Sequence, residues 1–268
     1  MSYANLSLER DEHVALITLN RPETLNALNG ALQADIINAV TEVREDDEIR
    51  ALVITGAGRG FCSGADISGG PRPGAEAPPQ VPQNRRLDDL QWMGRLALSV
   101  GQLDKPTIAA VNGVAAGAGM SLALACDLRV GSENTRFVVV FPERSLSPDS
   151  GMSYFLPRII GYSRAADLIF TSRRVDAEEA YRLGLLDRLV PHEKLIEEAI
   201  SLAKQICFWP PMAIRSSKRV LQQNIEVDLE TALKNEVTGL SYARSAPQDM
   251  REQRQAWVEK RPPKFTGQ

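Results

Sequence analysis

Short apolar runs and amphipathic stretches alternate along the first two thirds of the chain. Three apolar runs are typical of buried strands: 14–19, 51–55 and 107–111. Between the first two, apolar residues recur at spacings of four, four and three, which predicts a helix with one apolar face: Leu32, Ile36, Val40 and Val43. Since strands alternate with helices, the pattern predicts an α/β core of repeated ββα or βαβ units.

Beyond Gly151 helical periods dominate. A helix is expected over 177–183, with Gly184 as its C-cap, and the next apolar face is formed by Leu195, Ala199, Leu202 and Ile206. Three further helices are expected: 211–224, 228–244 and 247–260. We therefore expect a core domain over residues 1–200 and an all-helical region over 201–268. The latter is too thin for a large core of its own and should pack on the core and on neighbouring subunits.

One stretch interrupts this pattern. Residues 68–84 contain five prolines and three glycines, and helical periodicity resumes directly afterwards. The composition predicts a loop rather than a linker between domains. This loop and two large side chains after it, Trp92 and Met93, would shape a pocket there, so the sequence does not specify what the pocket accepts.

Composition narrows the class of protein. The 268 residues are 43% hydrophobic, which is sufficient for a sizeable core, and the formal charge of −3 gives no field that would gather nucleic acid or an anionic membrane. Three cysteines without a Cys-x-x-Cys pair fit a reducing compartment, and two histidines exclude a His-rich metal site. Because the N-terminus has no signal pattern, we expect a cytoplasmic protein.

Two bends hold the candidate chemistry. Residues 61–67 and 112–119 each follow a predicted strand and expose small residues, so their backbone N–H groups are open to a ligand oxygen. A helix entered at the second bend would also favour negative charge there. Small residues equally allow tight packing of a helix on a sheet. The glycines at 56–60 have the spacing G-x-G-x-G, which differs from a dinucleotide fingerprint.

These pieces together resemble the crotonase superfamily, the enoyl-CoA hydratases and isomerases, over nearly the whole chain. The matching segments, in order, are Asn20-Arg21-Pro22, Asn26-Ala27-Leu28, Gly60-Phe61-Cys62-Ser63-Gly64-Ala65-Asp66, Lys105-Pro106, Asn112-Gly113, Cys126-Asp127, and Glu259-Lys260-Arg261 with Pro263 and Phe265. The resemblance implies a crotonase-like core of ββα units and a helical C-terminal trimerisation region. It further implies an acyl-CoA thioester substrate, with coenzyme A part of the substrate and no separate cofactor, and a homotrimer or a dimer of trimers.

The resemblance also suggests site residues. It implies that the N–H groups of Ser63 and Ala118 hold the thioester oxygen. Residues matching positions along the coenzyme A are Ala27, Gly64, Ala65, Asp66 and Ile67. Trp257 and Lys260 match late positions that approach the coenzyme A of an adjoining subunit. Plainer roles are open for several of these: Asp66 as a helix cap, Trp257 in helix packing and Lys260 as a surface charge.

The acid/base residue would decide the reaction. Hydration of a double bond needs a water between two carboxylates, but this chain has Ser121 and Phe141 at the two positions where the resemblance expects them. The segment Pro148-Asp149-Ser150-Gly151 instead resembles the isomerase branch, which implies that Asp149 moves a proton between α- and γ-carbons beside an apolar wall from Phe141. A turn-forming role for Asp149 is also open.

Three alternatives are kept. A two-residue gap would let Glu143 replace the hydratase carboxylate, with a water held by Ser121. An acyl-CoA hydrolase would use Asp149 to activate water. A non-catalytic RNA-binding trimer is disfavoured by the net charge of −3. We expect double-bond isomerisation, with hydration as the first alternative.

Overall fold

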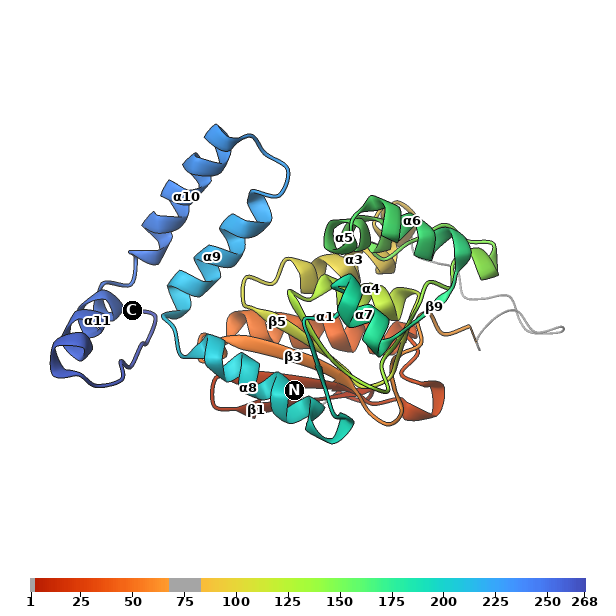
Figure 1. Ribbon diagram of the computed structural model, residues 1–268, viewed down its shortest axis with the longest axis horizontal. Coiled ribbons are helices and arrows are strands. Elements are labelled where there is room, and N and C mark those ends of the chain that lie inside the picture. The colour runs from red at the N-terminus through yellow and green to blue at the C-terminus, as the bar shows by residue number, and fades with distance from the viewer. Residues whose placement is uncertain (1–2, 68–82) are drawn as a thin grey trace.

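The computed structural model describes residues 3–67 and 83–268. The predicted loop at 68–84 lies outside the described residues except for its last two positions. The described chain forms two sheets with helices around them, and a helical extension at the C-terminal end (Figure 1). The mixed α/β class and the helical C-terminal region are as predicted.

The larger sheet has six strands in the order β1-β2-β3-β5-β7-β10. These strands are β1 (Leu6–Asp11), β2 (Val14–Leu19), β3 (Ala51–Gly56), β5 (Thr107–Val111), β7 (Leu128–Ser132) and β10 (Arg188–Val190). Only the β1–β2 pair is antiparallel; the other pairs are parallel. Parallel strands are buried on both faces, which explains why β3 and β5 have no exposed residue and read as continuous apolar runs.

The smaller sheet has four strands in the order β4-β6-β8-β9: β4 (Gly60–Cys62), β6 (Val114–Ala116), β8 (Arg136–Val138) and β9 (Arg174–Asp176). Two expectations change here. The segment after Asn112-Gly113, expected to enter a helix, first forms β6, and the helix begins at Ala118. The strand expected over 137–141 ends at Val138, because Phe141 opens a 3₁₀ turn.

Helices cover both faces of the larger sheet. The core helices are α1 (Gly30–Glu45), α2 (Gln83–Arg86), α3 (Gln91–Gly101), α4 (Ala118–Ala125), α5 (Met152–Ile160), α6 (Tyr162–Thr171), α7 (Ala177–Leu183) and α8 (Leu195–Cys207), with 3₁₀ turns η1 (Pro22–Thr24), η2 (Pro142–Arg144) and η3 (His192–Lys194). Alternate residues of β3 face opposite sides: Val53 packs in the cluster with α8, while Leu52 and Ile54 pack with α1, α3 and α4. None of the described helices meets the length and apolarity that a membrane crossing requires.

The last three helices form what we call the C-terminal arm, residues 211–268: α9 (Pro211–Gln223), α10 (Leu229–Ala243) and α11 (Pro247–Glu259). Figure 1 shows α9 and α10 as an antiparallel pair that projects from the core, with α11 beyond them. Many large apolar side chains of this arm are exposed: Leu221, Leu229, Leu233, Val237, Leu240, Trp257 and Val258. Many large apolar side chains exposed on one region are typical of a surface that binds another protein or another copy of the chain.

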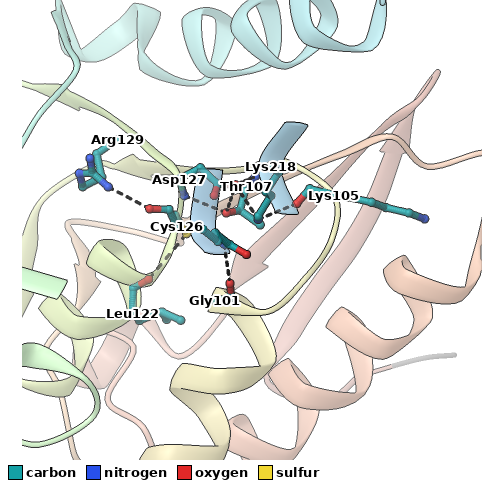
Figure 2. A network of polar contacts seen from close by, with 9 residues as sticks. Gly101, Lys105, Thr107, Leu122, Cys126, Asp127, Arg129 and Lys218 are labelled. Carbon is teal, nitrogen blue, oxygen red and sulfur yellow. Dashed lines mark hydrogen bonds and ion pairs between the residues drawn. The ribbon is translucent and has the colours of Figure 1, made fainter. Parts of the chain in front are cut away.

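Polar side chains attach α9 to the core. Figure 2 shows the central contact, where the buried Lys218 ammonium lies 2.7 Å from Asp127 Oδ2 and 2.9 Å from the carbonyl oxygen of Lys105. Arg215, one turn earlier, donates to Asp104, and Gln222, one turn later, donates to the carbonyl of Gly101. Because these residues are spaced three and four apart, they lie on one side of α9.

The predicted boundary between core and C-terminal region at residue 200 falls inside α8. This helix packs on the sheet through residues as late as Ala203 and Cys207. The packing therefore favours a boundary after Cys207, and the two-part division itself stays a prediction.

Candidate active site

The first predicted bend lies directly against the start of α4. Gly64 has a φ of +93°, and a Cβ at this position would lie 2.7 Å from the carbonyl oxygen of Ala116 and 3.5 Å from the nitrogen of Ala118. Only glycine allows this backbone conformation together with this approach. The bends at 61–67 and 112–119 therefore meet, which is the arrangement that the resemblance implies.

The second bend presents a helix N-terminus without a side-chain cap. Gly117 is the N-cap of α4, and no side chain accepts from the first turn. The N–H of Ala118 is the first of the helix and has no partner in the described part of the chain. A free N–H at the positive end of a helix dipole favours an oxygen that gains negative charge.

The structure corrects the first donor. The N–H of Ser63 donates to the carbonyl of Leu25 at 2.9 Å, and its hydroxyl donates to Thr24, so the predicted role of Ser63 as donor to the thioester oxygen is wrong. Around Ala65, the carbonyl of Gly64 accepts from Leu28 and the N–H of Asp66 donates to Leu28.

The N–H of Ala65 consequently faces away from Leu28. It has no partner within residues 3–67 and 83–268. Ala65 follows Gly64, which lies against Ala118. Ala65 and Ala118 thus offer two unpaired N–H groups on adjoining segments, and an oxyanion hole requires two donors that converge on one oxygen.

Two buried asparagines hold the turn behind this pair. Asn26 Nδ2 donates to the carbonyls of Ala57 and Gly60 at 3.0 and 2.8 Å, while Asn112 Nδ2 donates to Gly58 at 2.9 Å. Satisfied amides of this kind fix a backbone that no strand ladder holds. Both residues belong to segments that carry the family resemblance. Their role in holding this turn is not visible in the sequence, because their partners are backbone atoms.

The Asp66 carboxylate forms an ion pair with Arg21. It lies 2.9 Å from the Arg21 guanidinium, and both side chains are largely buried. Arg21 also donates to the carbonyl of Ala27. The ion pair therefore connects the segment that holds Ala65 to the turn before α1. Ile67 is exposed. Contact of Ala27, Asp66 and Ile67 with coenzyme A stays a prediction, as does the plainer role of Asp66 as a helix cap.

The loop before α5 brings the candidate base to α4. The hydroxyl of Ser121, three residues beyond Ala118 on the same helix, donates to the carbonyl of Asp149 at 3.4 Å. The Asp149 carboxylate is half-buried, and this burial raises its pKa above the ordinary value, while the hydroxyl of Ser150 acts in the opposite direction. A half-buried carboxylate with raised proton affinity, on a loop that contacts the helix of Ala118, has the character of a general base.

The other predicted residues are placed as follows. Phe141 is buried, and its carbonyl accepts from Leu146, which holds the turn before the loop of Asp149. Glu143 lies on η2 and is exposed. Trp257 and Lys260 lie on α11 and at its end; both are exposed and far from α4 in the same chain (Figure 1). Any role of theirs at this site would need another subunit.

Comparisons with known proteins show the family to which the chain belongs. A family model described as enoyl-CoA hydratase/isomerase matches residues 9–268. The chain is 34% identical to a crotonyl-CoA hydratase of Syntrophomonas wolfei, over 99% of each chain. It is 36% identical to a 1,2-epoxyphenylacetyl-CoA isomerase of Escherichia coli, over 96% of each.

A solved structure gives the same result for the fold. The enoyl-CoA hydratase from Bacillus anthracis superposes with a TM-score of 0.89 and is 34% identical, covering 99% of this chain and all of the other. The matches thus include proteins named hydratase and one named isomerase, and all span almost the full length.

Proposed function

The chain belongs to the enoyl-CoA hydratase/isomerase family, and from this premise we propose that it moves the double bond of an enoyl-CoA thioester with Asp149 as the single acid/base. It is an enzyme of this family. The proposal concerns the reaction, the residues and the assembly.

The proposed mechanism uses the two backbone donors and one carboxylate. The N–H groups of Ala65 and Ala118 donate to the thioester oxygen that lies between them. Asp149 removes a proton from the α-carbon of a 3-enoyl-CoA, and the electron pair moves onto the thioester oxygen to give a dienolate that the two N–H groups stabilise. The protonated Asp149 then returns the proton to the γ-carbon, which leaves the double bond between the α- and β-carbons.

One observation supports isomerisation over hydration: the loop that contacts α4 carries one half-buried carboxylate, Asp149, and the other acidic residue before it, Glu143, is exposed. The side chain at the equivalent of the first hydratase carboxylate is Ser121, which donates to the Asp149 backbone. A shift of one proton within the substrate needs one base, whereas addition of water needs a base and an acid on a bound water.

Hydration is the alternative, because several relatives are named enoyl-CoA hydratases. It would use Glu143 and a water held by Ser121. The exposed position of Glu143 on η2 would have to change for this. Hydrolysis of the thioester by Asp149 and water is a third, less supported candidate.

The test compares two carboxamide variants on two substrates. With Asp149→Asn, conversion of a 3-enoyl-CoA to a 2-enoyl-CoA should fall by at least about a hundredfold with substrate affinity retained, since removing a general base typically costs 10²–10⁴ in rate. Glu143→Gln is the matched control and should leave this conversion unchanged. Unchanged turnover in Asp149→Asn, or hydration of 2-enoyl-CoA abolished by Glu143→Gln, would contradict the proposal.

We also propose the oligomeric state, the compartment and the cofactor requirement of the enzyme. The exposed apolar face of the C-terminal arm supports a homotrimer or a dimer of trimers, in which Trp257 and Lys260 approach the coenzyme A of an adjoining subunit; a mobile lysine charge suits a phosphate. Three free, buried cysteines fit the cytoplasm. The chemistry needs no cofactor beyond the coenzyme A of the substrate.

A further inference from the structure

Ser150 is held in a conformation that serine rarely adopts. Its φ is +53°, in the left-handed region, and it is followed by Gly151 at +85°. The left-handed region costs a residue with a Cβ roughly 1 kcal/mol. Ser150 is nevertheless buried, and its hydroxyl donates to Oδ1 of the neighbouring Asp149 at 2.9 Å.

The rest of Asp149 is fixed from two other directions. Its carbonyl accepts from the N–H of Met152 in the first turn of α5 and from the hydroxyl of Ser121 on α4. The carboxylate oxygen Oδ2, by contrast, has no hydrogen-bond partner in residues 3–67 and 83–268. One oxygen of the candidate base is therefore occupied and the other is open.

We propose that Ser150 is a positioning residue that makes Asp149 a one-oxygen base, with Oδ1 held by the hydroxyl and Oδ2 carrying the proton to and from the substrate. This inference rests on the proposed function of Asp149 and deepens it. A base that uses a single, fixed oxygen delivers the proton along one line to the α- and γ-carbons, because the carboxylate cannot rotate without losing the Ser150 bond. The same bond stabilises the charged form and sets how readily the proton is released.

Neighbouring charged groups in the described residues do not account for the raised pKa of Asp149. Helix α4 carries no charged side chain, the Arg158 of α5 pairs with Glu226, and the Arg95 of α3 pairs with Asp88. On η2, Glu143 and Arg144 are exposed. Within residues 3–67 and 83–268, burial raises the pKa of Asp149 and the Ser150 hydroxyl lowers it, so removing the hydroxyl should leave the burial effect.

The experiment replaces Ser150 and follows the pH dependence. In Ser150→Ala and Ser150→Gly, the acid limb of the kcat/KM profile for 3-enoyl-CoA should move upward by about one pH unit, because the carboxylate loses a charge-assisted hydrogen bond. The glycine variant relieves the left-handed backbone, so it keeps the test available if the alanine variant does not fold. The carboxyl titration of Asp149, followed by NMR without substrate and assigned by its loss in Asp149→Asn, should shift in the same direction.

Ser172→Ala is the matched control, since Ser172 is also buried at positive φ but its hydroxyl has no partner in the described residues. Its acid limb should stay at the wild-type position. A wild-type acid limb and titration in both Ser150 variants would overturn the inference while Asp149→Asn is inactive. Full activity in Asp149→Asn would instead overturn the proposed function on which it rests.

Discussion

At the scale of single residues, the site depends on backbone positions that only small side chains permit. Gly119 shows this most directly, because a Cβ on it would lie 2.1 Å from the carbonyl oxygen of Cys62, which belongs to the strand that leads into the first donor. Backbone atoms on both sides meet here, so neither can rotate away as a flexible side chain would. The close approach of β4 to the start of α4 thus depends on the absence of a Cβ at Gly119.

We therefore expect Gly119→Ala to separate the two halves of the oxyanion hole. The variant should lose about 1–3 kcal/mol of stability by overpacking. It should also lose about 10²–10³ in kcat, the usual effect of removing one oxyanion donor. Urea unfolding and steady-state kinetics measure the two effects. Gly30→Ala, where a Cβ meets no atom within 4 Å, is the control and should be near wild type in both. Wild-type kcat in Gly119→Ala would contradict this explanation.

At the scale of elements, polar and charged side chains attach helix α9 to the core. Lys218 is buried with only 7% of its side chain exposed, and it connects to β5 through Asp127, whose carboxylate also accepts from the N–H and hydroxyl of Thr107. Figure 2 shows Asp127 between these groups. A single carboxylate thus connects two strands of the sheet and the first helix of the arm.

Loss of this ammonium should loosen the arm. Lys218→Met keeps the length of the side chain but leaves Asp127 without its cation. Breaking a largely buried ion pair from one side costs about 3 kcal/mol. Lys234→Met is the matched control, because the Lys234–Glu230 pair is exposed on α10 and such pairs contribute at most about 1 kcal/mol. Urea denaturation of both variants measures the difference, and equal losses would show that Lys218 has no special role.

Periodicity in the sequence predicted most elements but not their polar attachments. The strand at 107–111 and the helix at 177–183 occur as predicted, because each shows a clear apolar period or a glycine cap. Strand β6 was missed, since a run of small buried residues has no period that separates a strand from a helix. The Lys218–Asp127 pair joins residues 91 positions apart, a relation that no local pattern contains.

The candidate site was also only partly predictable, because some of its features are local in sequence and others arise when distant segments meet. The resemblance suggested Ala118, whose N–H has no partner in the described residues, and its role as a donor stays a prediction. Ser63, the other suggested donor, already donates its N–H to the carbonyl of Leu25. Which peptide N–H faces the site depends on the left-handed conformation of Gly64 and on the pairing of Ala65 with Leu28, and both appear only when the two segments meet.

At the scale of the whole molecule, the arm carries an apolar face that its own core does not cover. Val237 lies on α10 with 67% of its surface exposed, and Leu229 and Leu233 of the same helix are also exposed. A helix pair that projects from the core with such side chains needs a partner to remove them from water. The proposed trimer would provide it.

A charge on this face should dissociate the assembly. Val237→Asp would bury a carboxylate without a partner at the proposed interface, which costs at least about 1–3 kcal/mol for each copy. The variant should sediment with a smaller mass than wild type in analytical ultracentrifugation and lose activity toward the thioester. Val237→Thr keeps the shape without the charge and should remain assembled. Equal masses for wild type and Val237→Asp would place the interface elsewhere.

The oxyanion donors are peptide N–H groups, and this has a consequence for inheritance. A codon change at position 65 or 118 alters a side chain but keeps the N–H unless it introduces proline. The proposed ability to hold an enolate therefore depends less on the side chains at positions 65 and 118 than on the small residues around them, such as Gly64 and Gly119. The proposed proton carrier, by contrast, is one side chain, that of Asp149. A substitution of Asp149 can therefore change the reaction while the two backbone donors stay in place.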